Sequence, residues 1–96
     1  MQVTKPTTID KEEVLHLQFP GDEVLKDKEN IAARRMELDR ATTLGNIEHT
    51  KFKIVFEDNK GVKQVETTIW ATTDKRVILK KGAVIPINRI HEIKLV

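Results

Sequence analysis

The chain has 96 residues, of which 39% are hydrophobic and 33% are charged, and its formal net charge is +2. This length suits one domain with a small core, and the composition is unlike that of chains too polar and too charged to fold. Cysteine and serine are both absent from the sequence, which excludes disulfides, thiolate metal sites and the serine and cysteine hydrolases.

Charge is distributed unevenly between the two halves of the chain. Residues 1–48 contain seven basic and ten acidic side chains, whereas residues 49–96 contain ten and five. Such an asymmetry suggests either a surface that faces a polyanion or attraction between the halves. The sequence has neither a secretory signal nor an apolar run near the roughly 20 residues of a membrane span. We therefore expect a cytoplasmic protein that makes no contact with a membrane.

The chain begins with a polar segment that shows no periodicity. We predict that residues 1–12 form a disordered tail and that residues 13–96 form a single α+β domain. Leu15, Leu17 and Phe19 alternate with polar residues, which predicts a first strand over residues 14–19. The Pro20-Gly21 pair should end this strand.

A helix is predicted over about residues 23–44, because this stretch is rich in good helix formers and lacks Gly and Pro. Its apolar stripe is thin and centres on Ile31 and Leu38. Gly45 and Asn46 should stop the helix.

Charged residues of the predicted helix recur at neighbour spacings. Asp39 lies four residues after Arg35, and Glu37 lies three residues from both Arg34 and Arg40. We interpret these as ion pairs on the solvent face, although Arg34 or Arg35 occupies a position where a fuller apolar face would have an aliphatic residue.

The second half reads as five short strands with a turn signal at almost every junction. Phe52, Ile54 and Phe56 alternate with other residues and should share the core face. Turn residues occupy positions 58–61, and Lys81-Gly82 predicts a tight hairpin turn. The five predicted strands cover about residues 51–57, 63–72, 76–80, 84–87 and 90–96.

Five short strands cannot bury two faces as a flat sheet, so closure into a barrel is the economical solution for their edges. The order and spacing over residues 26–96 resemble SH3-like barrels, in particular the Sm-like variant, in which a helix also precedes five strands. The expected fold is therefore α+β: one strand and one helix, followed by a five-stranded antiparallel meander closing into an SH3-like or Sm-like barrel.

A second resemblance is local. Residues 44–46, 51–58, 66–71 and 84–90 are similar to a family of small uncharacterised proteins from Bacteroidetes-type bacteria. This resemblance implies a bacterial protein and brings no activity with it.

No combination of residues predicts catalysis. His16, His49 and His91 lack metal-ligand spacing, and the four glycines are isolated turn formers rather than a phosphate-binding loop. We expect a protein that is not an enzyme, with no catalytic residue, no metal site and no cofactor.

A basic β surface is the one feature that favours a function. Its cations could contact phosphates of RNA or DNA, which gives affinity without sequence readout, and an exposed tryptophan could stack on a base. The phase of Trp70 places it either beneath the helix or in solvent, and the usual burial of tryptophan favours the first. The candidate nucleic-acid-binding residues are Lys75, Arg76, Lys80, Lys81, Arg89 and Trp70.

Two other interpretations of this surface stay open. The same cations could simply solvate strand edges and discourage edge pairing. Alternatively, the protein could be a protein–protein adaptor or self-associate, through the strand edge at residues 84–87 or through the helix stripe with Ile31 and Leu38.

Overall fold

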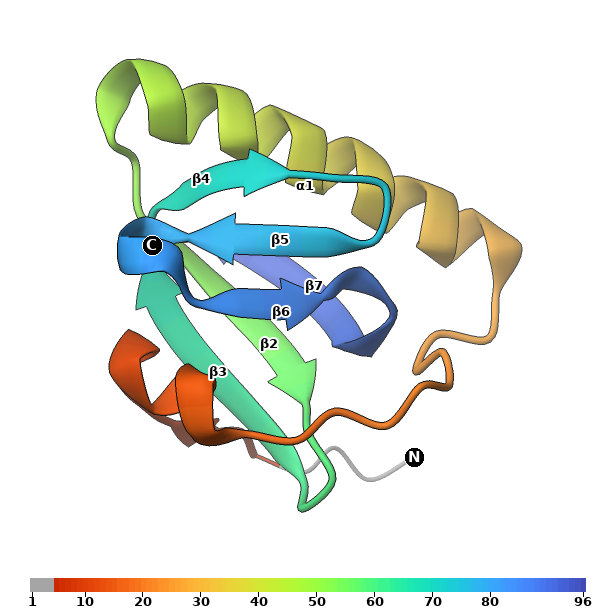
Figure 1. Cartoon of the computed structure of the whole chain (residues 1–96). Coiled ribbons are helices and arrows are strands. Elements are labelled where there is room, and N and C mark those ends of the chain that lie inside the picture. Colours follow the sequence, from red (N-terminus) through yellow and green to blue (C-terminus); the bar gives the residue numbers. More distant parts are fainter. Residues whose placement is uncertain (1–4) are drawn as a thin grey trace.

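The computed structural model describes residues 5–96, which form one long helix and two small β-sheets (Figure 1). The four-stranded sheet has the order β1-β3-β2-β7, and the three-stranded sheet has the order β4-β5-β6. The strands are β1 (Thr7–Thr8), β2 (Phe52–Glu57), β3 (Val62–Thr67), β4 (Ile69–Thr72), β5 (Arg76–Leu79), β6 (Val84–Pro86) and β7 (Ile90–Leu95). The helices are η1 (Lys11–His16), α1 (Lys28–Glu48), η2 (Lys80–Gly82) and η3 (Ile87–Arg89), of which the three η elements are 3-10 turns.

The prediction of a closed barrel made from a five-stranded meander is wrong, because the described residues form seven strands in two separate sheets. The long second strand is split at Thr68. Thr67 pairs with Phe52 in one sheet, whereas Ile69 pairs with Leu79 in the other. Thr68 itself is buried, and its hydroxyl donates to the carbonyl of His49 at 3.3 Å.

The predicted barrel would also require pairing between β6 and β7, which lie in different sheets. In the part of the chain that the structure describes, β6 pairs with β5 alone. Pro86 ends β6 and has no N–H to offer a further strand, and the 3-10 turn η3 then turns the chain before β7 begins.

The predicted first strand over residues 14–19 is also wrong, since residues 11–16 form the 3-10 turn η1. The carboxylate of Glu13 accepts the backbone N–H of Asp10 at 2.9 Å, which favours a local turn over an extended chain. Val14 is the buried residue here, whereas Leu15, which the alternation placed on the inner face, is 64% exposed.

The predicted disordered tail, residues 1–12, falls partly outside the described residues, which begin at residue 5. Within it, Thr7 and Thr8 pair in parallel with Lys63 and Gln64 at the edge of the four-stranded sheet.

The helix α1 starts and ends later than the predicted range of 23–44. Asp27 caps it by accepting the N–H of Glu29 at 3.2 Å. Gly45 does not stop the helix but lies within it, at the point where α1 comes so close to β4 that a side chain would clash with the carbonyl oxygen of Ile69. The helix ends at His49, whose left-handed backbone (φ 56°) directs its N–H to the carbonyl of Gly45.

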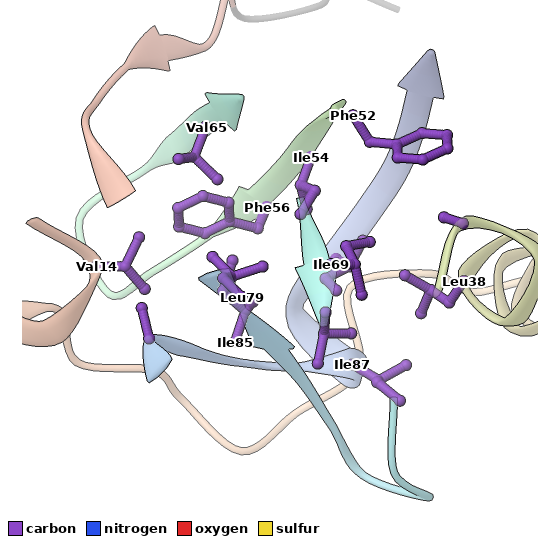
Figure 2. Packing of buried hydrophobic residues seen from close by; sticks show 14 residues of the cluster. Val14, Leu38, Phe52, Ile54, Phe56, Val65, Ile69, Leu79, Ile85 and Ile87 are labelled. Atoms are coloured by element: carbon purple, nitrogen blue, oxygen red, sulfur yellow. The ribbon is translucent and has the colours of Figure 1, made fainter. Parts of the chain in front are cut away.

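The core lies between the two sheets, with α1 along β4 and η1 near the opposite end (Figure 1). Figure 2 shows side chains from both sheets, α1 and η1 converging on one interior. The expected burial of Phe52, Ile54 and Phe56 is confirmed. Leu38 is also fully buried, so it is not available for partner binding through the helix stripe, which was one of the two surfaces of the adaptor interpretation. None of the helices in residues 5–96 is long and apolar enough to cross a membrane.

Candidate nucleic-acid interface

The three-stranded sheet has one face in the core and one in solvent. Val77 and Leu79 of β5 are buried, whereas Ile78 between them points the other way and is half-buried. Its register partners on either side are Ala71 of β4 and Val84 of β6, which therefore share its face. We call the solvent face of this sheet, outlined by Trp70, Ala71, Ile78 and Val84, the outer face.

Trp70 lies in solvent, and the expectation that the helix would cover it is wrong. Ile69 pairs with Leu79 and Ala71 pairs with Ile78, so Trp70 is the extra residue of a β-bulge. The helix packs on the side of β4 that carries Ile69, and Trp70 is 46% exposed. A large aromatic side chain held this open on a sheet is a signal for binding, because tryptophan is mostly buried in folded proteins.

Two pairs of cations lie at the two ends of β5. Lys80 and Lys81 belong to η2, where Lys81 has a left-handed backbone (φ 71°). Lys75 ends the β4–β5 turn and Arg76 begins β5, and the Thr73 hydroxyl accepts both of their backbone N–H groups, at 3.2 and 2.9 Å. At about 3.3 Å per residue, the four steps from Arg76 to Lys80 separate the two pairs by roughly 13 Å. All four side chains are exposed, and none forms an ion pair within residues 5–96.

Arg89 does not belong to this basic surface, although the sequence placed it there. Its side chain is buried, and its Nε donates to the carbonyl of Glu57 at 3.0 Å. Its Nη1 donates to both the carbonyl and the carboxylate of Asp22, each at 2.9 Å. Arg89 therefore holds the segment before the helix against the sheet, and its burial keeps it away from the basic surface.

Arg34 was also misassigned, since it is buried rather than paired with Glu37 on the solvent face. It forms a bidentate ion pair with Glu23 at 2.6 and 2.7 Å and donates to the carbonyl of Ile90 at 3.0 Å. The hydrogen bonds from Arg34 lower the pKa of Glu23, although burial opposes this. The signal for this role was the arginine inside the thin apolar stripe. The expected exposed pair of Arg35 with Asp39 is confirmed at 3.4 Å.

A cleft of about 470 Å³ opens beside the β4–β5 turn. It lies between the segment around residues 19–23, the turn at residues 74–76 and the residues 86–88 that end β6 and begin η3. The ion pair of Arg34 with Glu23 also borders it. Arg76 borders both this cleft and the outer face, since it is paired with Pro86 across the ladder.

The three histidines lie in different elements and have different contacts, with His16 at the end of η1. His49 ends the helix, and the Nε2 of His91 lies 2.9 Å from a carboxylate oxygen of Glu57 on the neighbouring strand. Among residues 5–96, no group of three or more His, Asp or Glu side chains could hold a metal ion.

Comparison with protein-family models, with curated proteins and with solved structures gives no match for this chain. Function is therefore inferred from the geometry of the outer face and of the adjoining cleft.

Proposed function

We propose that this protein is a non-enzymatic binding module that holds RNA or DNA with unpaired bases on its outer face. The observation that carries the proposal is the exposed Trp70 on a sheet face flanked by four cations that have no ion-pair partner within residues 5–96. Trp70 is the stacking surface for a base, and Lys75, Arg76, Lys80 and Lys81 contact the phosphates on either side.

The energetics of this arrangement suit an unpaired strand. Stacking of one base on an aromatic side chain contributes about 1–3 kcal/mol, and in a duplex both faces of each base are already stacked. Lysine and arginine contacts add affinity by releasing condensed counterions. A net charge of only +2 on the whole chain means that the attraction must come from the local grouping of cations around the outer face.

The spacing of the cations favours a linear polyanion. The two pairs are separated by roughly 13 Å along β5, with Trp70 beside the Leu79 end of that strand. A strand of nucleic acid presents negative charge repeatedly along its length, so it can engage both pairs while a base between them stacks on the indole ring.

Fluorescence anisotropy of a labelled single-stranded oligo(dC) tests the proposal. We expect binding at low salt, with log affinity falling linearly against log salt at about 0.7 per phosphate neutralised. Replacing Lys80 and Lys81 by Ala should weaken binding and reduce that slope by about 1.4. The matched control replaces Lys26 and Lys28, which are exposed at the start of α1, and it should change neither quantity beyond the small effect of net charge.

Three results would contradict the proposal: no binding at low salt, binding that salt does not weaken, or binding to anionic lipid vesicles in place of the oligonucleotide. The last result would assign the same tryptophan and lysines to a membrane surface.

A further inference from the structure

The cleft beside Arg76 has the dimensions of a ligand site. Its volume of about 470 Å³ falls within the range of about 300–1,000 Å³ found for small-molecule pockets. Because Arg76 and Pro86 are ladder partners at its mouth, a strand of nucleic acid lying across the outer face reaches the cleft without a break.

The walls of the cleft are apolar and fixed in place. Phe19 and Pro20 form one side, and Pro86 and Ile87 form the other. The ring of Phe19 packs against Phe56 of the core, with 6.0 Å between their centroids, so this wall does not depend on a bound ligand. Apolar walls of this kind suit the face of a planar base.

The polar groups inside the cleft include two hydrogen-bond acceptors, on Asn88 and Glu23, and the buried guanidinium of Arg34, whose Nε has no hydrogen-bond partner within residues 5–96. The amide nitrogen of Asn88 donates to the carbonyls of Gly21 and Asp22 at 2.7 and 3.2 Å. This orientation leaves its Oδ1, which accepts no hydrogen bond from residues 5–96, for another donor. One oxygen of Glu23 accepts from both Arg34 and the N–H of Leu25, and the other accepts from Arg34; a carboxylate has lone pairs for further donors.

Charged side chains of the β4–β5 turn and the start of β5 also border the cleft. Lys75 and Arg76 are cations without ion-pair partners in the described part of the chain. Asp74 beside them adds one further acceptor. A matching ligand therefore has a flat apolar body, amino donors at its inner end and a phosphate at its outer end.

Resting on the proposed function, we infer that this cleft selects one unpaired base that carries an exocyclic amino group. The amino group donates to Asn88 Oδ1 and to Glu23, and the phosphate of that nucleotide lies on Lys75 and Arg76. Cytosine presents such an amino donor, whereas thymine and uracil present a carbonyl oxygen at the same position. A carbonyl would face the acceptors of the cleft unfavourably, so the cleft discriminates between the bases.

The ratio of affinities for oligo(dC) and oligo(dT) of equal length tests the inference. A base contact of this kind contributes about 1–3 kcal/mol of discrimination, so oligo(dC) should bind at least about fivefold more tightly. Gly21 lines the cleft, and its position tolerates a side chain, because a Cβ there meets nothing within 4 Å and the backbone is not in the left-handed region. Gly21→Phe should therefore narrow the cleft. This variant should bring the ratio to about one, whereas Lys60→Phe on the β2–β3 turn should leave it unchanged.

Equal affinity of the wild-type protein for the two oligonucleotides, or a ratio that survives Gly21→Phe, would overturn the inference while leaving the proposed function intact. If neither oligonucleotide binds, the proposed function fails and the cleft is tested alone. The side-chain amide of Asn88 should then shift in NMR spectra on addition of CMP and not of UMP. Equal shifts, or no shift with either mononucleotide, would contradict selection by the cleft.

Discussion

Gly45 is where the helix and the three-stranded sheet come closest. A Cβ atom there would clash with the carbonyl oxygen of Ile69, which is backbone and cannot move aside at small cost. We expect Gly45→Ala to lower the free energy of unfolding by about 1–3 kcal/mol through overpacking, although alanine favours a helix by about 1 kcal/mol. Urea denaturation measures this. The matched control Gly21→Ala, in open space, should be neutral or slightly stabilising, and equal stability of the two variants would contradict the close approach.

Asp58 gives the protein a specific dependence on pH. Burial alone would raise the pKa of Asp58. The hydrogen bonds from Lys63 and from the N–H groups of Lys60 and Gly61 together lower it by more, so the pKa lies below its ordinary value. A carboxylate with a lowered folded-state pKa stabilises the protein above the unfolded pKa of about 4, and this stability is lost as the pH falls through the folded value.

The test is the urea midpoint between neutral pH and about pH 3, a range that spans the unfolded-state pKa of about 4. The wild-type midpoint should fall in the acidic part of this range. Asp58→Asn should be less stable at neutral pH and should lose less stability on acidification, with the remainder due to Glu23, whose pKa Arg34 lowers. Parallel profiles for the two proteins would show that Asp58 does not contribute.

The partners of individual arginines could be predicted from the sequence only where they are close in the chain. The exposed pair of Arg35 with Asp39 was predictable because its partners lie one helical turn apart. The partners of Arg34 and Arg89 are 11 and 67 residues away along the chain. The thin apolar stripe was a local signal for the burial of Arg34, but no local pattern separated Arg89 from the exposed cations, so Arg89 was assigned to the wrong surface.

Among the elements, η1 replaces a strand that alternation predicted. Val14 is 2% exposed and its neighbour Leu15 is 64% exposed, which gives a matched pair of variants. Val14→Asp should lower the free energy of unfolding by at least about 2 kcal/mol, because it loses the burial of a valine and places a charge in the core. Leu15→Asp should stay within about 0.5 kcal/mol of the wild type. A larger loss in urea denaturation for Leu15→Asp than for Val14→Asp would favour the alternating strand and contradict η1.

The exposure of Trp70 depends on a single β-bulge in β4. In a regular, continuous strand Val65, Thr67, Ile69 and Ala71 would share one face, and the first three are buried. The bulge at Trp70 then shifts the register by one residue, which moves Ala71 to the outer face. A bulge without glycine leaves no mark in the sequence, and therefore the exposure of the tryptophan could not be predicted.

For the whole molecule, the sequence located the helix, the core face of β2 and most of the strands, because these follow from local periodicity and turn residues. The relation between the sheets could not be obtained in this way. Whether β6 pairs with β7 depends on the direction in which η3 sends the chain, and the split at Thr68 depends on contacts with His49 and Lys80. The cleft was missed for the same reason, since three segments distant in the sequence form it.

The proposed function depends on direct contact between Trp70 on the outer face and the nucleic acid. Trp70 is the only tryptophan in the chain, so its intrinsic fluorescence reports on this face without interference from another indole. On titration with unlabelled oligo(dC), we expect the emission to be quenched with the midpoint found by anisotropy, and to recover as salt dissociates the complex. Binding seen by anisotropy without any change in Trp70 emission would contradict the claim.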